Sequence, residues 1–183
     1  QYIRQDGPQS HLVKRGTPPM GGLVINLAIV LGWLSSALYR WIVSGRTPSV
    51  NAMLVLFVML SMGILGFIDD FAKVAKKQNE GLSIHGKFIG QVIFATLYAV
   101  LSLTIKAPDG TVSAHSGIKF IERTLISFDA LGTVLSTILF IIWVNLLLSA
   151  WTNATNLTDG LDGLASGSSM VSFIGFAVIA LWE

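Results

Sequence analysis

Five apolar runs are the feature of this sequence that most restricts its fold. Each run is long enough to cross the roughly 30 Å hydrocarbon core of a bilayer, which takes roughly 17–25 helical residues. The runs cover approximately Leu23–Val43, Ala52–Ile68, Phe88–Ile105, Leu131–Ala150 and Leu164–Trp182. Three of them contain many β-branched residues, but their length favours helices over strands. The sequence therefore predicts an all-α, polytopic transmembrane helix bundle with five spans.

The composition also indicates a lipid environment. Of 183 residues, 52% are hydrophobic and only 12% are charged, whereas a soluble domain carries about 25% charged residues. Because so few charges cannot cover a water-facing surface, lipid must face much of the chain. The net charge of +2 gives no reason to expect a nucleic-acid partner, which would need a basic patch. The absence of cysteine excludes disulfides, thiolate zinc sites and cysteine nucleophiles.

The polar segments between the runs alternate between the two sides of the membrane. Two crossings separate 1–20 from 69–87, and two more separate 69–87 from 151–163, so these three segments share one side. The other side receives 44–51 and 106–130. The first set holds seven Lys and Arg residues, and the second holds five when Arg40, near the end of the first run, is counted with it. Because cytoplasmic loops carry an excess of Lys and Arg, we expect the first set to be cytoplasmic and the second extracytoplasmic.

The ends of the chain favour an internal fragment of a longer protein. The sequence begins without Met and stops at Glu183, directly after an apolar run. We expect residues 1–183 to form part of a single transmembrane domain. Within the long extracytoplasmic segment, Ile118–Phe128 has enough apolar residues for a short hairpin or an interfacial helix.

Two adjacent carboxylates, Asp69 and Asp70, follow directly on the second apolar run. Adjacent carboxylates repel each other unless they share a cation or a proton. Lys73 and Lys77 follow at helical spacing, so a row of lysines is expected beside the acids. This pattern indicates a Mg²⁺ or general-base site with lysines that hold phosphate, because Mg²⁺ binds one or two carboxylates together with substrate phosphates. A solvated helix end with acid–base pairs is the alternative interpretation.

A second polar cluster contains two asparagines and two aspartates between the last two apolar runs: Asn153, Asn156, Asp159 and Asp162. A turn followed by a capped helix accounts for one aspartate and one glycine of this cluster. It does not require four such side chains in ten residues. Asn and Asp can coordinate a metal or bind a sugar or base, and the neighbouring glycines let the backbone approach a ligand. We therefore favour a binding site.

A third cluster precedes the first apolar run. Lys14 and Arg15 stand beside Gly16 and Thr17 and can hold a phosphate, although a flexible leader is the alternative interpretation. All three clusters fall on the predicted cytoplasmic side. Acids and lysines without a Ser or Cys nucleophile motif suit phosphoryl transfer, where positioning and charge stabilisation do most of the work. A lipid-linked acceptor would explain why such a site lies at a membrane edge.

At these residues the chain resembles the phospho-N-acetylmuramoyl-pentapeptide transferases, within the polyprenyl-phosphate N-acetylhexosamine-1-phosphate transferase superfamily. The match is carried by three motifs in order: Asp6-Gly-Pro-x-Ser-His-x-x-Lys14-x-Gly-Thr-Pro-x-Met-Gly-Gly, Gly66-Phe-Ile-Asp-Asp70-Phe-x-Lys73 and Asn153-x-x-Asn156-Leu-Thr-Asp-Gly-Leu-Asp-Gly-Leu-Ala165. The spans between the motifs agree in number and order, so the resemblance covers the whole chain.

The resemblance implies a reaction, a cofactor and partners. Family members transfer phospho-N-acetylmuramoyl-pentapeptide from its UDP carrier to undecaprenyl phosphate, which gives UMP and lipid I for peptidoglycan synthesis. They require Mg²⁺, have roughly ten transmembrane helices and are commonly homodimers. The expected location is the bacterial cytoplasmic membrane, with the active face toward the cytoplasm.

The resemblance also assigns roles to individual residues. It makes Asp69 and Asp70 the catalytic pair and metal ligands, and it places Lys73 and Lys77 on the phosphate and lipid side of a cleft. The remaining matched positions are substrate-binding residues, one of which, Asn156, is also a metal ligand: Lys14, Asn156, Asp159 and Asp162. The resemblance does not choose between a one-step mechanism and a covalent one.

Two departures from the family pattern matter. Pro19 stands where the family usually has a threonine, which removes a hydroxyl. The chain also stops before the family's third essential aspartate and its histidine-rich loop, so we expect these 183 residues alone to be inactive.

Three rival interpretations remain. The closest is a sister enzyme that transfers GlcNAc-1-phosphate to the same lipid, although the wording of the motifs favours the muramoyl-pentapeptide branch. A transporter or channel module would need ionisable residues inside its spans, and the interiors of these runs hold essentially none. A non-catalytic membrane scaffold is the third.

Overall fold

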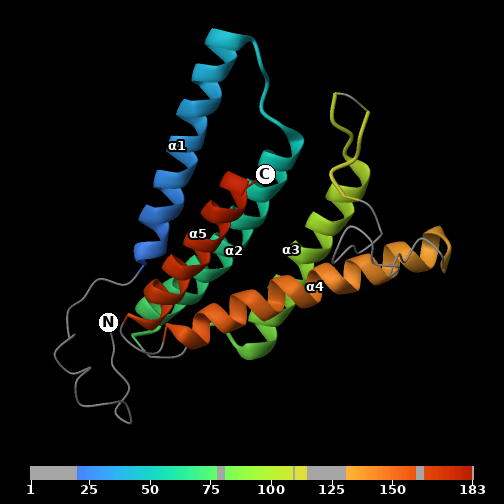
Figure 1. Ribbon diagram of the computed structural model, residues 1–183. Coiled ribbons are helices and arrows are strands. Elements are labelled where there is room, and N and C mark those ends of the chain that lie inside the picture. The colour runs from blue at the N-terminus through green and yellow to red at the C-terminus, as the bar shows by residue number, and fades with distance from the viewer. Residues whose placement is uncertain (1–19, 78–80, 109, 115–130, 160–162, 183) are drawn as a thin grey trace. The chain divides into compact units, whose positions relative to one another are not determined.

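The computed structural model describes residues 20–77, 81–108, 110–114, 131–159 and 163–182. These residues form five helices: α1 (Gly21–Ser44), α2 (Val50–Lys76), α3 (Ile84–Thr104), α4 (Thr133–Thr158) and α5 (Leu164–Trp182) (Figure 1). All five are long and apolar enough to cross a membrane. Within the described ranges the β pairing is limited to an isolated bridge between Lys106 and Val112. The predicted all-α fold with five spans is confirmed.

Two helices continue well beyond the apolar runs that predicted them. α2 runs to Lys76 and α4 to Thr158, each about two turns past the end of its apolar run. Hydropathy marks the part of a helix that faces lipid, and backbone hydrogen bonds do not stop where hydropathy falls. Part of each polar segment that was expected to link two spans is therefore helical.

Short capped links join the first three helices. The hydroxyl of Ser49 accepts a hydrogen bond from the Ala52 N–H at 3.3 Å at the start of α2. Ser83 caps α3 in the same way through the Gly86 N–H at 3.1 Å. α1 ends at Gly45, whose φ of 62° is a left-handed conformation that glycine adopts without strain. Helices joined by links this short lie antiparallel as neighbours.

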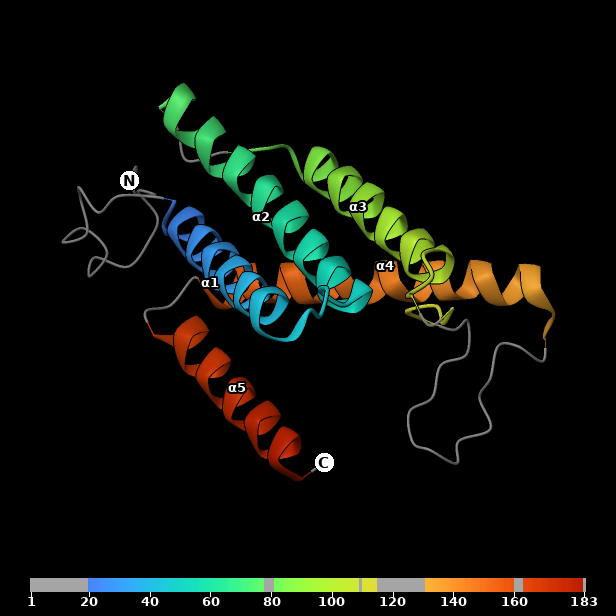
Figure 2. The ribbon, with the colours of Figure 1, turned by 90° about the horizontal axis from the view of Figure 1, so that it is seen from above.

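The molecule divides into two units, residues 1–145 and 146–183, and each is described by itself. In the first unit, α2 lies between α1 and α3 and packs against both (Figure 2). The helices approach closely at glycines. A Cβ added at Gly63 would lie 2.6 Å from Nδ2 of Asn26, and one added at Gly90 would lie 2.7 Å from Cδ1 of Leu65. Small residues at such contacts are typical of membrane helices, where close packing replaces the hydrophobic effect.

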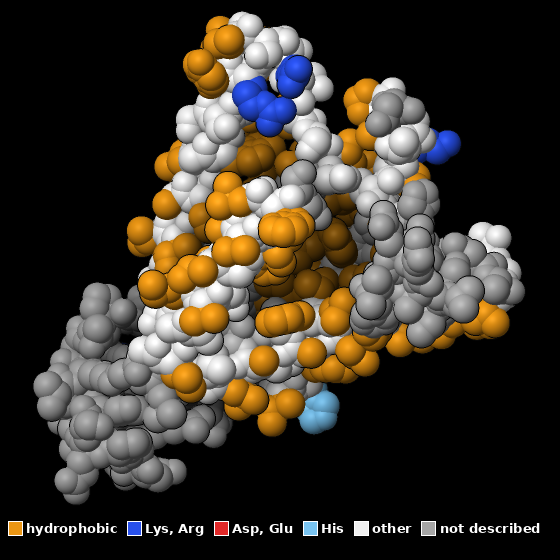
Figure 3. Space-filling view, in the orientation of Figure 1, with side chains coloured by type: hydrophobic (Ala, Val, Ile, Leu, Met, Phe, Trp, Pro, Cys, Tyr) orange, Lys and Arg blue, Asp and Glu red, His pale blue; other side chains and the backbone are white. Residues whose placement is uncertain are grey.

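The buried positions of the first unit mix apolar and small polar side chains. The apolar ones are Leu54, Leu65, Ala95, Ala99, Phe140 and Val144, and the polar or charged ones are Ser61, Asp69, Gln91, Ser102 and Ser136. Large apolar side chains are exposed on all five helices, and they cover much of the face shown in Figure 3. An exposed apolar surface of this extent is expected of a protein that faces lipid.

Two further segments complete the description. After α3 the chain turns back in a small hairpin, in which the Ala107 N–H donates to the Thr111 carbonyl at 2.7 Å. The hairpin or interfacial helix predicted at Ile118–Phe128 lies outside the described residues. The second unit contains the end of α4 and the whole of α5, which begins after Gly163 at a φ of 78°.

Candidate functional site

Asp69 lies near the carboxyl end of α2 and is the one charged side chain that is buried among the described residues, with 6% of its surface exposed. Its Oδ1 accepts a hydrogen bond from the Leu82 N–H at 2.9 Å. Its Oδ2 lies 2.8 Å from Nζ of Lys73 and 3.2 Å from Nζ of Lys87. A buried carboxylate is costly unless its oxygens are paired and hydrogen-bonded. Both oxygens of Asp69 therefore serve to hold this end of the helix together.

Asp70 has a more open environment. Its side chain is 39% exposed, and its Oδ1 accepts a hydrogen bond from Nζ of Lys73 at 2.8 Å. Within the described residues its Oδ2 makes no hydrogen bond or ion pair. Lys73 stands three and four residues after the two acids, so one ammonium group bridges both carboxylates. The pair is thus asymmetric: Asp69 is enclosed by protein groups, and Asp70 keeps one oxygen accessible.

The expected row of lysines ends after Lys73. α2 stops at Lys76, and Lys77 adopts a left-handed conformation with φ of 52°, where its N–H caps the helix through the Lys73 and Val74 carbonyls. The side chain of Lys77 is exposed and makes no ion pair with the acids in the part of the chain that the structure describes. The helical register that predicted Lys77 beside the acids is lost because the helix terminates there.

The structure adds Lys87 and Gly81 to this cluster, and sequence reasoning missed both. Lys87 lies on the first turn of α3 and reaches Asp69 from the neighbouring helix. A Cβ at Gly81 would fall on the carboxylate and the backbone oxygen of Asp69, so only glycine lets the link fold directly over it. The available signal was the short polar link between two spans, which places the last turn of one helix beside the first turn of the next.

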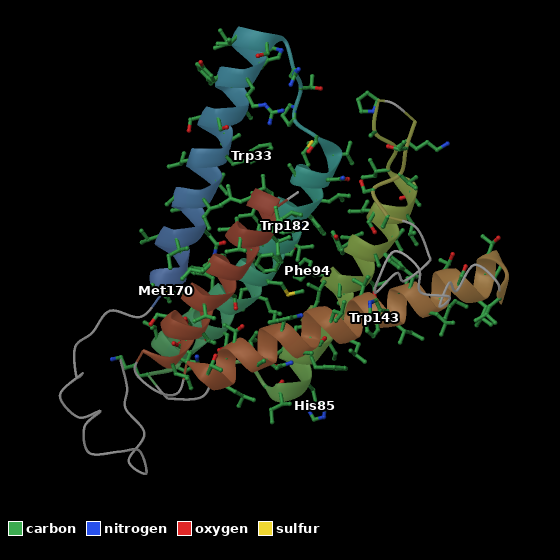
Figure 4. The ribbon with its side chains drawn as sticks, viewed as in Figure 1. Trp33, His85, Phe94, Trp143, Met170 and Trp182 are labelled. Atoms are coloured by element: carbon green, nitrogen blue, oxygen red, sulfur yellow. The ribbon has the colours of Figure 1, made fainter. Side chains whose placement is uncertain are left out.

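The other histidine and lysine side chains near this end behave differently. His85, on the first turn of α3, is exposed and points away from the helices (Figure 4). Lys76 is exposed at the end of α2. The interactions with Asp69 and Asp70 therefore come from Lys73, Lys87 and the Leu82 amide.

The second unit holds the Asn and Asp cluster, and part of the expected loop is helix. Asn153 and Asn156 lie on the last turns of α4, and Asp159 follows them with its N–H donating to the Thr155 carbonyl at 3.1 Å. Threonine hydroxyls bond back to the helix; that of Thr155 donates to the Trp151 carbonyl at 2.9 Å. Such local bonds satisfy polar side chains inside a helix, which explains why helical structure continues here. The side chains of Asn156 and Asp159 are exposed.

Two predicted substrate-binding residues, Lys14 and Asp162, lie outside the described residues, as does Pro19. Within the described residues no group of three or more His, Cys, Asp or Glu side chains comes together. An oxygen ligand for Mg²⁺ must have a free lone pair. Asp70 meets this condition at Oδ2, whereas both oxygens of Asp69 already accept from protein donors.

These features define a polytopic membrane protein with an acid–lysine cluster at the end of a membrane-spanning helix. Residues 52–183 match the model of glycosyl transferase family 4. The chain belongs to that family.

Curated relatives match the whole chain. Proteins of Bifidobacterium longum (strain DJO10A) and Bifidobacterium adolescentis are 69% and 67% identical to it over 183 residues. A protein of Beutenbergia cavernae is 42% identical over the same length. In each case the alignment covers 100% of this chain and 50% of the relative, so the chain spans about half the length of the curated relatives it matches. Each is named phospho-N-acetylmuramoyl-pentapeptide-transferase, which confirms the resemblance drawn from the three motifs.

Proposed function

We propose that the full-length protein carrying this sequence transfers phospho-N-acetylmuramoyl-pentapeptide from a UDP-linked donor to undecaprenyl phosphate. The products are UMP and lipid I, a precursor of peptidoglycan. The observation that carries the proposal is 69% identity, across the whole chain, to a relative whose name states the phospho-N-acetylmuramoyl-pentapeptide transfer. The carboxylate and lysine cluster at the end of a membrane-spanning helix supports it, because phosphoryl transfer relies on positioned charges.

The two aspartates have different roles in this proposal. Asp69 is a positioning residue, because its oxygens hold Lys73, Lys87 and the Leu82 amide. Asp70 is the carboxylate that meets the substrate, since its side chain is 39% exposed, its Oδ2 has no partner among the described residues, and its Oδ1 contacts the bridging lysine. A free carboxylate oxygen can accept the proton of the lipid phosphate as a general base. The positive charge of Lys73 lowers the electrostatic repulsion between the acceptor phosphate and the two carboxylates.

Mg²⁺ is the proposed cofactor. When bound, it supplies positive charge that offsets the charge of the donor diphosphate. Of the paired aspartates, Asp70 fits a magnesium ligand and Asp69 fits less well, because three protein donors already occupy most of the acceptor sites of Asp69. Asn156 remains a proposed ligand on the resemblance alone. The other proposed substrate-binding residues are Lys14, Lys77, Asp159 and Asp162.

The remaining proposals concern location and assembly. We propose that the protein lies in the bacterial cytoplasmic membrane as a homodimer, with Asp69 and Asp70 at the cytoplasmic face. The same side holds 1–20, 69–87 and 151–163, and the opposite side holds 44–51 and 106–130. Since the chain covers 50% of its relatives, we expect these residues alone to show no transfer.

The test is UMP release from full-length protein in detergent with Mg²⁺, undecaprenyl phosphate and the UDP-muramoyl-pentapeptide. We expect release that stops with EDTA and that falls sharply in Asp70→Asn. Release from UDP-GlcNAc, but not from the muramoyl-pentapeptide donor, would assign the protein to the sister branch. The absence of UMP release with either donor would contradict the transferase proposal and favour a transporter or scaffold.

A further inference from the structure

A polar hollow lies at the opposite end of α2 from Asp69. The link between α1 and α2 and the adjoining turns of both helices line it, with two arginines and three hydroxyl residues: Arg40, Arg46, Ser36, Thr47 and Ser49. Ser49 is roughly 30 Å from Asp69 along the helix. The hollow therefore belongs to the other side of the membrane and is separate from the acid–lysine cluster.

Among the described residues, the two arginines have no acidic partner. Neither forms an ion pair within the described residues, where the ion pairs involve Lys73 and Lys87. Both guanidinium groups are exposed, and both line the same hollow. Figure 3 shows a patch of Lys and Arg side chains, in blue, at the tip of the hairpin of α1 and α2. Two like charges that share a hollow repel each other, and a bound anion relieves that repulsion.

Along α1 the lining of the hollow passes from the charged Arg40, through the small side chains of Ala37 and Ser36, to the large ring of Trp33. Trp33, Ala37 and Arg40 follow one another at spacings of four and three residues, so they lie on one side of the helix. Figure 4 shows Trp33 on the side of α1 that faces α2, and Ala52 of α2 lines the hollow with it. Trp33 lies about 10 Å deeper than Arg40 along the helix. A ligand that fills this hollow would be charged at one end and apolar at the other.

We propose that this hollow binds the phosphodiester of an anionic glycerophospholipid such as phosphatidylglycerol. A guanidinium group presents parallel N–H donors that match two phosphate oxygens, and the hydroxyls of Thr47 and Ser49 can donate further hydrogen bonds. The oxygen of Ser49 accepts from the Ala52 amide, which leaves its hydrogen free to donate. The acyl chains would lie against Trp33 and the apolar face of α1.

The position of the arginines favours a lipid over a dissolved anion. Arg40 lies near the end of α1 and Arg46 in the link that follows it, so both stand beside the end of a membrane-spanning helix. Long Arg side chains near the ends of such helices extend to the interface, where phospholipid phosphates lie. The α1–α2 link is on the side with fewer Lys and Arg residues, so the general excess of cytoplasmic cations does not account for two arginines there. A net-anionic lipid balances them, whereas phosphatidylcholine brings its own cation.

The test compares the wild type with Arg40→Gln/Arg46→Gln and with Lys106→Gln, all as full-length protein. Lys106 is exposed just after α3, on the same predicted side, and does not line the hollow. Native mass spectrometry would measure phosphatidylglycerol retained from nanodiscs that contain phosphatidylglycerol and phosphatidylcholine. We expect about a tenfold loss of retained phosphatidylglycerol in the arginine variant and none in the control. Equal retention in all three proteins would overturn the proposal.

Two further measurements test whether misfolding of the double variant explains a loss of retention and whether the ligand is a dissolved anion. Arg40→Lys and Arg46→Lys keep the charge but lose the planar donor pair, so each should weaken retention even if the double variant fails to fold. Unchanged retention in both lysine variants would count against the site. Inorganic phosphate at millimolar concentration should not displace the lipid, and displacement would instead identify a simple anion site. Lipid retention is measured without transfer, so its outcome does not depend on the proposed function.

Discussion

The ends of α2 and α4 carry the two described polar clusters, and they are organised in opposite ways. At the end of α2, Asp69 is fixed by Lys87 of α3 and by the Leu82 amide of the link, in addition to Lys73 of its own helix. At the end of α4, threonine hydroxyls bond to carbonyls of their own helix, as for Thr155 to the Trp151 carbonyl and Thr158 to the Thr155 carbonyl, both at 2.9 Å. Contacts from a second helix can hold a charged side chain in one geometry before a ligand arrives.

We infer from this difference that the polar clusters at the ends of α2 and α4 have different roles. A carboxylate enclosed by donors is preorganised, and preorganised charge is what phosphoryl transfer needs. Asn156 and Asp159 are exposed, and on the proposal that they bind substrate, that substrate would order their amide and carboxylate groups. Substitutions at the end of α2 should therefore change both stability and turnover, and substitutions at the end of α4 should change substrate affinity alone.

The largest expected effect separates the two aspartates. Asp70→Asn should lower kcat by at least about 100-fold, because it removes the proposed general base, and should leave the thermal midpoint nearly unchanged. Asp69→Asn should lower the midpoint as well, because it weakens the anchor of two lysines. Steady-state UMP release and thermal unfolding of the full-length protein measure the two quantities. Equal loss of stability in both variants would remove the asymmetry between the aspartates.

The next effect tests how closely the link covers Asp69. Gly81→Ala should lower the free energy of unfolding by about 1–3 kcal/mol, because its Cβ would fall on the Asp69 carboxylate. Turnover should fall with it, since Asp69 must move. Gly32→Ala is the matched control, because a Cβ there meets nothing within 4 Å and alanine favours a helix. A Gly81→Ala protein as stable and active as Gly32→Ala would show that the link does not position Asp69.

Sequence patterns predicted the helices better than they predicted the site. Apolar length determined the five spans, and α5 was predicted at its observed bounds, Leu164–Trp182. The helix ends at Lys76 and Thr158 were missed because hydropathy falls before the hydrogen-bond ladder ends. The i+3 and i+4 spacing correctly predicted Lys73 beside both acids, since that contact is local.

Contacts between helices were beyond the reach of sequence spacing. Lys87 meets Asp69 only because α2 and α3 pack side by side, and 18 residues of sequence separate them. Gly81 matters through one close approach that no local pattern records. The same limit applies to Lys77, whose expected place in the row depended on a helix that ends one residue earlier. The roles of the predicted site residues stay predictions.

A smaller effect is expected at the end of α4. Asn156→Ala should raise KM for the UDP-linked donor about tenfold, the loss of one hydrogen bond to a charged ligand, with kcat and the thermal midpoint unchanged. Thr155→Ala is the control, because its hydroxyl is already bonded to the Trp151 carbonyl. A drop in kcat without a change in KM would mean that Asn156 acts on the reacting groups. The end of α4 would then contribute to turnover, as the end of α2 does, and not to substrate affinity alone.

The smallest effect concerns a contact between helices away from both clusters. Nδ2 of Asn145 on α4 donates to Oγ1 of Thr96 on α3 at 3.0 Å, while Oδ1 of Asn145 is buried without a partner among the described residues. The free-energy penalty of burying this unpaired oxygen offsets much of the stability that the Asn145–Thr96 hydrogen bond contributes. A double-mutant cycle of Asn145→Leu and Thr96→Ala should therefore give a coupling of about 0.6 kcal/mol, as interhelical hydrogen bonds in membranes average. Activity should not change in either variant. A coupling above about 2 kcal/mol would mean that α4 is held to α3 as firmly as Asp69 is held by its lysines, and that cross-helix anchoring is not confined to the acid–lysine cluster.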